Sequence, residues 1–385
     1  MSGYQGWFNC PEDGMDLGWK HWRKKSKPPF GPGNVSVDLW PDVSELGEGE
    51  RYETGFRHAD GRVAEVFSSA DEATVGRHFE WMREYEIDGV FLQRFASGLD
   101  HEDRRRHNDR VLANVRKGAE STGRVYAMMY DLSGLREGEV KQVAEDWARW
   151  EEEGLTKDRG YLHHDGKPVV AVWGVGFGDD RQYTLDECDE LVEFLKERGC
   201  TVMLGVPTGW RTLERDSVDD PRLHEIIRKA DIISPWTVGR YRSPEGAARH
   251  GERYWAVDAA WCEGAELEYL PVVFPGFSWH NLNGEELGAI PRLKGKFLWS
   301  QFVAAKRAGS EMVYVAMFDE VDEGTAIFKC TNDVPVGEGV TFLGYEGLPP
   351  DHYLWLTGKG AELIRGELPL RGVVPKRPKP VKKES

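Results

Sequence analysis

Four acidic side chains crowd into five positions directly after an apolar run near the end of the chain. The run, Met312–Phe318, is rich in aliphatic and aromatic residues and predicts a strand buried on both faces. The acids that follow it are Asp319, Glu320, Asp322 and Glu323. Because carboxylates repel one another, this crowding indicates chemistry rather than stability. Paired carboxylates at the end of a strand suit acid/base or nucleophilic chemistry on a sugar, and a solvated acidic turn is the alternative.

Segments typical of strands and of helices alternate along the chain. Eight segments have the apolar or aromatic character of strands: 4–8, 89–93, 125–130, 168–173, 201–206, 231–234, 270–274 and 312–318. Amphipathic segments between most of them predict helices, among them 72–85 and 107–122. This alternation predicts an α/β protein, a (β/α)8 TIM barrel, with a doubly wound open sheet as the alternative. No GxGxxG or Walker-type loop follows a strand, which argues against the nucleotide-binding alternative.

The chain divides into a barrel and a short C-terminal part. We expect the barrel to span residues 1–340, with a long first βα loop at 20–66 that contains Asp38-Leu-Trp-Pro-Asp42. Loops of this length commonly form a lid or a pocket wall. Residues 341–370 predict a strand, a loop and a helix packed on the barrel exterior. The Pro/Lys-rich segment 371–385 predicts a flexible tail.

Active sites of such barrels lie at the carboxyl ends of the strands. The residues expected there, apart from the acids, are Trp7, Asn9, His21, Trp22, Gln93, Arg94, Tyr130, Asp131, Trp173, Trp236, Arg240, Tyr241, Trp279 and His280. Each aromatic residue taken alone fits core packing equally well. Their recurrence at several strand ends favours a sugar ligand, because rings stack on sugar faces while amides and guanidinium groups bind hydroxyls.

Composition excludes several partners. The 385 residues carry a net charge of −16, which argues against nucleic acid or an anionic membrane as the partner. No run of apolar residues is long enough to span a bilayer, and the N-terminus shows no signal-peptide pattern. The five cysteines lack CxxC spacing and predict reduced thiols in a cytoplasmic protein. The composition leaves the oligomeric state open.

Other site chemistries have weaker support. No HxH or HExxH spacing accompanies the acids, and His163-His164 precedes a strand in what we expect to be a hairpin. No GxSxG elbow suggests a serine nucleophile. We therefore expect neither a metal nor a cofactor, although Asp319, Asp322 and Glu323 as Mg²⁺ or Ca²⁺ ligands of a lyase or hydrolase remain an alternative.

The acidic motif also resembles a known family. Asp319-Glu-Val-Asp-Glu-Gly-Thr325 is similar to the Asn-Glu-Trp-His-Glu-Gly-Thr signature of the endo-α-mannosidase-like glycoside hydrolases, families 71 and 99. Trp7-Phe-Asn-Cys-Pro11 and Gly18-Trp-Lys-His-Trp22 resemble that group's Trp-Tyr-Gly-Asn-Pro and Lys-Trp-Ile-His-Trp segments, and Pro275-Gly276 its Gly-Pro-Gly turn. The likeness touches both ends of the predicted barrel.

The resemblance implies a retaining glycosidase in which Glu320 and Glu323 are the catalytic pair. In that family the first glutamate is thought to act as a base on the sugar's own 2-hydroxyl, forming a 1,2-anhydro intermediate, and the second as the proton donor. His21 matches an active-site histidine of the family. Asp319, Val321 and Asp322 replace the family's Asn, Trp and His, so the resemblance does not extend to mannose specificity.

The sequence thus predicts a glycoside hydrolase acting on an α-linked or modified glycoside. A carbohydrate-binding barrel without catalysis is the alternative from a different class. Sugar identity, linkage and endo or exo mode stay open.

Overall fold

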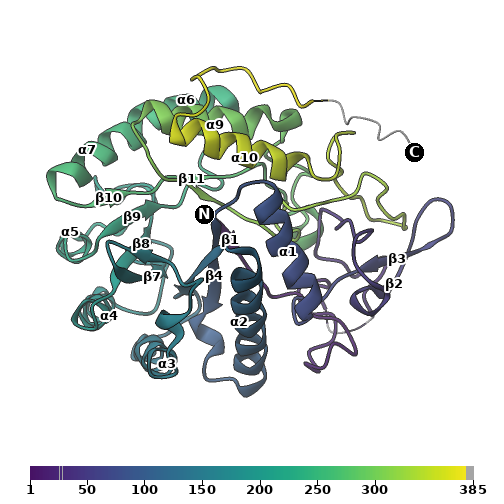
Figure 1. Ribbon diagram of the computed structural model, residues 1–385, viewed down its shortest axis with the longest axis horizontal. Coiled ribbons are helices and arrows are strands. Elements are labelled where there is room, and N and C mark those ends of the chain that lie inside the picture. Colours follow the sequence, from purple (N-terminus) through teal and green to yellow (C-terminus); the bar gives the residue numbers. More distant parts are fainter. Residues whose placement is uncertain (26, 28, 379–385) are drawn as a thin grey trace.

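The computed structural model describes residues 1–25, 27 and 29–378, and it contains a ring of parallel strands surrounded by helices (Figure 1). The strands of the ring are β1 (Ser2–Tyr4), β4 (Gly89–Phe95), β5 (Val125–Asp131), β7 (Lys167–Trp173), β8 (Thr201–Val206), β9 (Ile232–Pro235), β10 (Glu268–Tyr269), β11 (Val272–Val273) and β12 (Tyr314–Val315). Their order is β10-β9-β8-β7-β5-β4-β1-β12-β11, with parallel pairing throughout.

One segment closes the ring. Strands β10 and β11 are separated by Leu270 and Pro271, and they pair with β9 and β12, respectively. The Leu270 N–H donates to Ile233 O (2.9 Å), and the Tyr314 N–H donates to Pro271 O (3.0 Å). Residues 268–273 therefore occupy a single barrel position with neighbours on both sides. The predicted (β/α)8 barrel is confirmed.

Helices follow the strands and cover the outside of the ring (Figure 1). They are α1 (Glu72–Glu84), α2 (Glu102–Thr122), α3 (Lys141–Glu152), α4 (Leu185–Glu197), α5 (Arg222–Ile227), α6 (Pro244–His250), α7 (Ala256–Gly264), α8 (His280–Asn283), α9 (Lys296–Arg307) and α10 (His352–Arg365). A π-helical turn, Gly251–Trp255, joins α6 to α7. None of the described helices has the length and apolarity needed to cross a membrane.

Local sequence explains where these helices begin and end. Thr184 and Glu187 form a capping box at α4, in which each side chain binds the other residue's backbone N–H. Helix α2 ends at Gly123, whose φ of 69° is the left-handed conformation that glycine adopts at little cost. Both signals are visible in the sequence, and both helices end within a residue or two of the expected position.

The first βα connection is the long insertion expected from the sequence. It carries an antiparallel hairpin of β2 (Tyr52–Arg57) and β3 (Val63–Val66), which lies at the side of the barrel (Figure 1). Backbone N–H groups of Asp38 and Leu39 donate to Val321 O at 3.0 and 3.2 Å. The insertion thereby contacts the acidic turn directly.

Some element boundaries differ from expectation. Strand β1 ends at Tyr4, whereas the sequence predicted a strand over 4–8, and β12 spans only Tyr314–Val315. In the C-terminal part, α10 packs against α9, but the expected strand is reduced to a bridge between Leu343 and Leu39. Residues 371–378 have no helix or strand, and 379–385 of the predicted tail lie outside the described residues.

Candidate active site

The acidic residues form a tight turn shortly after β12. The N–H groups of Thr325 and Ala326 both donate to Glu320 O, at 3.2 and 3.0 Å. Gly324 has a φ of 65°, and a Cβ there would lie 3.0 Å from Ser278, so glycine fits both the turn and the close approach. The Ser278 N–H donates to Glu323 O (2.9 Å) from the segment after β11. The turn is thus fixed by its own backbone and by a neighbouring loop.

Arg292 adds a second clamp on this turn. Its Nη2 donates to the carbonyl oxygens of Gly324 (2.8 Å) and Ala326 (2.7 Å). The guanidinium lies 4.9 and 4.5 Å from the ring centroids of Tyr345 and Tyr353, which belong to the C-terminal part. Such cation–π contacts stabilise a buried cation, and Arg292 has no ion pair with a carboxylate among the described residues. The C-terminal part therefore supports the acidic turn through Arg292.

The first two acids are held mainly by the residues that follow strand β1. Backbone N–H groups of Gln5 and Gly6 donate to the two carboxylate oxygens of Asp319, at 2.8 and 2.9 Å. Glu320 accepts hydrogen bonds on both oxygens, from Gln5 Nε2 and from Thr325 Oγ1. Asp319 therefore anchors the turn to the start of the chain, while Glu320 is oriented by two donors.

The other two acids are less fully bound. Asp322 Oδ2 lies 3.3 Å from His21 Nδ1, and its Oδ1 is buried without a hydrogen-bond partner among the described residues. Glu323 is half-buried, the most exposed of the four acids, and among the described residues its side chain has only a loose contact with the Trp279 indole. His21 stacks on Trp7 with ring centroids 4.0 Å apart and planes 4° apart.

Burial raises the pKa of every acid in the turn. Burial raises the pKa of Asp319 to about 7, even though two backbone N–H groups oppose the rise. Burial and the charge of Asp38 raise the pKa of Asp322 to about 8. Burial and the charge of Asp322 raise the pKa of Glu323 to about 8, with the Trp279 indole opposing. The turn therefore keeps protons at neutral pH that exposed carboxyls would lose.

The pKa of Glu320 is also raised, for two reasons. Burial and the charges of Glu323 and Asp322 raise its pKa well above the ordinary value, while its two hydrogen-bond donors oppose the rise. His21 shifts the other way, because burial and the nearby cations Lys20 and Arg104 lower its pKa to about 3. The imidazole beside Asp322 is thus neutral.

Residues from several other strands surround the acids. Gln93 Nε2 donates to Tyr314 Oη (3.0 Å) inside the ring, and the Tyr314 and Trp236 rings lie 6.2 Å apart. Trp236 in turn contacts Trp173 at 5.5 Å, edge to face. Asp131, at the end of β5, lies close enough to Glu323 to raise its pKa. Gln93, Trp173 and Trp236 thus form a connected group around Tyr314, while Asp131 and Trp279 lie near Glu323.

Two cavities adjoin His21. One, of about 220 Å³, is lined by Trp7, Asn9 and Phe95 among others, and one of about 400 Å³ extends from Trp19 and Lys20 to Asp322. His21 lines both. His21, stacked on Trp7, thus lines two hollows, one of which also includes Asp322.

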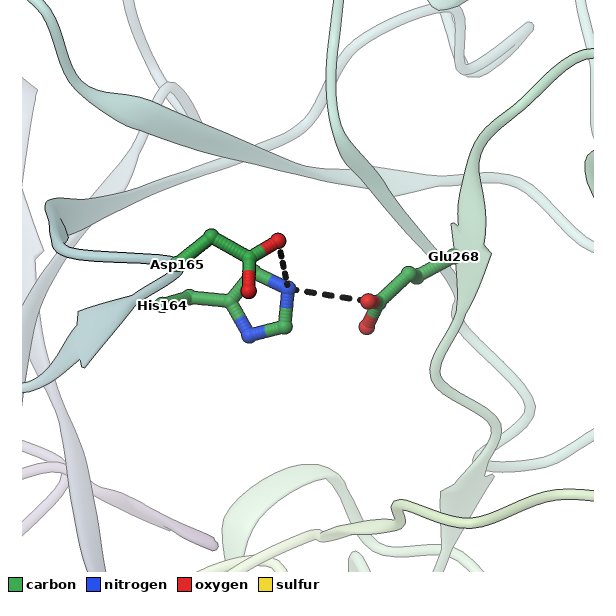
Figure 2. A group of neighbouring side chains, drawn as sticks. All are labelled: His164, Asp165 and Glu268. Carbon is green, nitrogen blue, oxygen red and sulfur yellow. Dashed lines mark hydrogen bonds and ion pairs between the residues drawn. The ribbon is translucent and has the colours of Figure 1, made fainter.

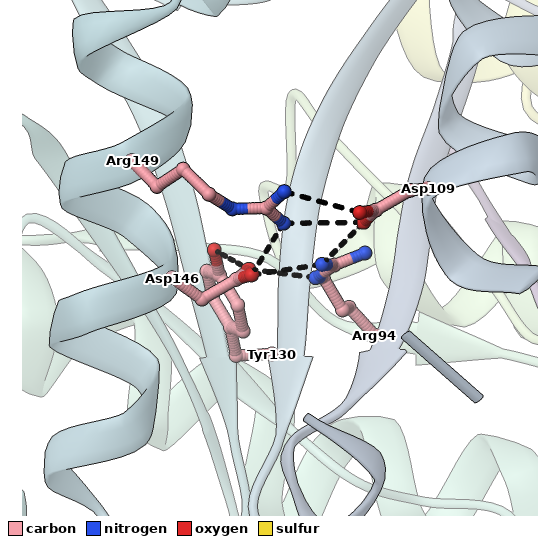
Figure 3. A network of polar contacts seen from close by, with 5 residues as sticks. All are labelled: Arg94, Asp109, Tyr130, Asp146 and Arg149. Atoms are coloured by element: carbon pink, nitrogen blue, oxygen red, sulfur yellow. Dashed lines mark hydrogen bonds and ion pairs between the residues drawn. The ribbon is translucent and has the colours of Figure 1, made fainter. Parts of the chain in front are cut away.

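Arg94 and Tyr130 lie elsewhere. Arg94 binds both oxygens of Asp146 (2.6 and 2.8 Å) and also Asp109 (2.7 Å), and Tyr130 Oη donates to Asp146 (2.9 Å) (Figure 3). Arg149 bridges the two aspartates at 2.9–3.2 Å. Because neighbouring residues of a strand face opposite sides, Gln93 points into the ring and Arg94 points to helices α2 and α3. We leave Arg94 and Tyr130 out of the site.

Five other expected site residues have mainly structural contacts. Trp22 is fully buried against Phe8 and Phe67. The Asn9 amide is bound to Asp13 and His107, both at 3.0 Å, although Asn9 also lines a cavity.

Tyr241 Oη donates to Gln301 in the core (2.9 Å), and Arg240 pairs with Asp216 (2.7 Å). His280 lies at the start of α8, where its backbone N–H donates to Asp38 (2.8 Å).

Comparison with known proteins places these features in context. No family model matches the chain. A curated Danio rerio protein named glycoprotein endo-alpha-1,2-mannosidase-like protein is 29% identical over 179 residues, which is 44% of this chain and 37% of that protein. The chain thus matches little more than a third of this relative's length.

Solved structures match over nearly the whole chain. Two structures of the GH99 endo-alpha-mannosidase from Bacteroides thetaiotaomicron, one with Bis-Tris-propane, have TM-scores of 0.68 at 15% and 16% identity, covering 95% of this chain and 97% of theirs. A glycoside hydrolase-like protein has a TM-score of 0.56 at 14% identity, covering 88% and 98%. The chain resembles the endo-α-mannosidase-like proteins. At these identities the structural likeness establishes the fold, and the resemblance predicted from the sequence is confirmed.

Three residues of the site were not expected from the sequence: Gln5, Tyr314 and Thr325. Gln5 was placed inside the first strand, because the aromatic run 4–8 suggested a later strand than the structure shows. Tyr314 was assigned to the core, although its hydroxyl lies between Gln93 and the sulfur of Met317. Had the first strand been predicted to end at Tyr4, Gln5 would have been placed just after a strand end and counted among the site candidates.

A separate group of metal-type ligands lies among the described residues. His164 Nε2 lies 2.9 Å from Glu268 and 3.7 Å from Asp165 (Figure 2). His163 and His164 form β6, which pairs antiparallel with β7 in the expected hairpin. The group lies at the amino ends of β7 and β10, opposite the acidic turn, and its two carboxylates are exposed. It has no part in the candidate active site.

Proposed function

We propose that the protein is a glycoside hydrolase that cleaves an α-linked glycoside with Glu320 and Glu323. The named relative is an endo-α-1,2-mannosidase-like protein, and the matching structures include a GH99 endo-alpha-mannosidase. These names suggest the reaction class. The observation that carries the proposal is that the two glutamates lie on one buried turn but differ in their hydrogen bonding.

The two glutamates differ in their hydrogen bonds. Both oxygens of Glu320 accept hydrogen bonds from strong donors, which favours the ionised form of a carboxyl group. Glu323 has only the loose contact with Trp279, and its pKa is about 8. Because burial and repulsion from neighbouring carboxylates raise the pKa of both glutamates, the pair retains a proton at neutral pH. We therefore assign the negative charge to Glu320 and the proton to Glu323.

These charge states support a two-step reaction. Glu320 accepts the proton of the substrate's 2-hydroxyl, O2 attacks C1, and the bond from C1 to the leaving oxygen breaks as Glu323 donates its proton. Water then attacks C1 and gives a proton to Glu323, while the C1–O2 bond breaks and O2 recovers its proton from Glu320. Two successive displacements at C1 retain the anomeric configuration. Direct attack by Glu320 on C1 would also retain it.

Neighbouring residues suit the binding of a sugar. Trp7, Trp173, Trp236 and Trp279 are half-buried indoles of the candidate site, and stacking on aromatic rings is a common mode of sugar binding. Asp322 beside neutral His21 provides a hydroxyl acceptor where the resembling family has His. The sugar unit bound there need not be mannose.

The metal-dependent alternative has less support. Both carboxylate oxygens of Asp319 are engaged by backbone N–H groups, so this residue holds the turn in place. The proposed hydrolysis uses only the two glutamates and water.

The test is hydrolysis of a panel of α-linked oligosaccharides and aryl α-glycosides. Replacing Glu320 or Glu323 by Gln keeps the side-chain shape but removes the proton transfer, so we expect kcat/KM to fall by about 10²- to 10⁴-fold. The anomer released by the wild-type protein, followed by NMR, tests retention.

The matched control is Glu190→Gln, which changes an exposed glutamate on α4 that has no ion pair among the described residues. Circular dichroism checks the fold of each variant. Full activity of both site variants would disprove the catalytic assignment. Sugar binding without hydrolysis by the wild-type protein would favour the non-catalytic barrel.

A further inference from the structure

A further cavity, of about 600 Å³, lies beyond the ends of β8 and β9. Five arginines line it: Arg215, Arg240, Arg242, Arg249 and Arg253. Arg215 lies in the loop after β8, and the other four lie between the end of β9 and the π-helical turn. The cavity thus opens at the carboxyl ends of the strands, the end that carries the acidic turn.

The positive charge of this cavity is largely uncompensated. Asp216 pairs with Arg240 (2.7 Å), and its carboxylate also accepts hydrogen bonds from the backbone N–H groups of Thr208 and Gly209. No ion pair or hydrogen bond engages the other four guanidinium groups within the part of the chain that the structure describes. Glu245 is near enough to Arg249 for that charge to contribute to lowering its pKa, but the two form no ion pair.

This charge is unusual for such an acidic chain. The net charge is −16, and like charges in one hollow repel one another. A concave surface with one sign of charge concentrates counter-ions of the opposite sign. A ligand with two negative charges would relieve the repulsion among the arginines.

Two further features order the cavity for a ligand. The guanidinium groups of Arg215 and Arg253 lie 5.1 and 5.5 Å from the Tyr254 ring, which limits their freedom. His250 lines the cavity and is only 6% exposed, yet its Nε2 has no hydrogen-bond partner among the described residues.

We propose that this cavity binds the phosphate group of a small phosphorylated ligand. The guanidinium fork matches the oxygen geometry of phosphate and donates charge-assisted hydrogen bonds to it. A neutral sugar would leave the arginine charges in place. A nucleic acid would be repelled by the acidic remainder of the chain. The proposal is independent of the glycosidase assignment, because none of these residues belongs to the acidic turn.

Isothermal titration calorimetry of the full chain tests the proposal with inorganic phosphate, glucose 6-phosphate and glucose. We expect glucose 6-phosphate to bind more tightly than inorganic phosphate, glucose to show no binding at this site, and the affinity to fall as salt is added. In Arg249→Ala/Arg253→Ala, the affinity should fall about 100-fold, at roughly tenfold for each charge-assisted hydrogen bond removed.

The matched control is Arg83→Ala/Arg136→Ala, which removes two exposed arginines that also have no ion pair among the described residues. It should bind like the wild type, and so should Glu320→Gln, whatever its hydrolytic activity. Equal affinity of the Arg249/Arg253 variant and the control would overturn the site. Inorganic phosphate binding as tightly as glucose 6-phosphate would overturn the ligand class and leave free phosphate as the ligand.

Discussion

Glu323 sets the alkaline limit of the proposed reaction. Its raised pKa, about 8, means that the proton needed by the leaving group is present at neutral pH and lost above that value. We therefore expect kcat/KM to fall as the pH rises through about 8. The charge of Asp322 contributes to this shift, so Asp322→Asn should lower the pKa of Glu323 and move the fall to lower pH. The measurement is kcat/KM against pH for both proteins.

The control for that comparison is Asp219→Asn, which changes an exposed aspartate of the loop after β8. Its profile should coincide with that of the wild type. An alkaline limb that stays in place in Asp322→Asn, or moves to higher pH, would show that Asp322 does not act on Glu323 as proposed.

At the residue scale, the sequence predicts groups of consecutive functional residues better than it predicts which face of a strand a residue occupies. The four acids were recognisable because they directly follow an apolar run. Gln93 and Arg94 were both expected in the site, but successive residues of a strand point to opposite sides and only Gln93 points inward. Whether Gln93 or Arg94 points into the ring depends on the tilt and register of all eight strands. The sequence of one strand does not contain that information.

At the element scale, the Arg94 network ties β4 and β5 to α2 and α3. Arg94→Met would leave the buried Asp146 without the guanidinium that binds both its oxygens. Removing one partner of a buried ion pair costs about 3–5 kcal/mol in the free energy of unfolding. We expect a loss of this order at pH 7 in urea denaturation, and a smaller one for Arg149→Met, whose side chain is 37% exposed.

The pH dependence of this loss has a defined sign. Burial alone would raise the pKa of Asp146, but Arg94 and the other donors hold it below the ordinary value. The stabilisation is therefore present above the unfolded pKa, near 4, and is lost as the pH falls through the lower folded pKa. The difference between wild type and Arg94→Met should shrink in acid. A difference that grows in acid would contradict this explanation.

Elements were predictable where local signals were strong. The five ring strands β4, β5, β7, β8 and β9 nearly coincide with apolar runs, and α4 begins at its capping box. Helix α6 was not expected, because Pro244 and Gly246 argue against a helix locally. Pro244 occupies the first turn, where its missing N–H costs nothing, and α6 packs against α9. Tertiary packing here outweighed local propensity.

At the scale of the whole molecule, four distant segments converge on the acidic turn. Gln5 and Gly6 bind Asp319, Asp38 and Leu39 bind the turn's backbone, and Ser278 binds Glu323 O. Arg292 joins the turn to Tyr345 and Tyr353. The sequence predicted the barrel and its order, but these contacts join segments up to 314 residues apart. No local pattern encodes such pairings.

This convergence has a consequence for the stability of the whole protein. The acids of the turn ionise near pH 4 in the unfolded chain, but folding raises the pKa of Asp319 to about 7 and that of Asp322 to about 8. Between these values the folded state binds more protons than the unfolded state, so this contribution to stability falls as the pH rises. Asp146, whose pKa is lowered, loses its contribution only in acid and does not oppose this trend.

We therefore expect Asp322→Asn to raise the Tm at about pH 9 and to change it little at about pH 5, where Asp322 is protonated in the fold. Asparagine has the shape of the protonated aspartate but carries no charge at any pH. The variant therefore avoids the loss of stability that ionisation of the buried Asp322 causes at alkaline pH. Thermal unfolding followed by circular dichroism between these pH values measures the effect, with Asp219→Asn as the exposed control. Parallel curves of Tm against pH for Asp322→Asn and the control would mean that the buried carboxyl is not the source of the pH dependence. Suppose that Asp322→Asn raises the Tm only at alkaline pH and also moves the fall in kcat/KM to lower pH. The two results together would show that one buried acid lowers the stability of the fold while raising the pKa of the proton donor.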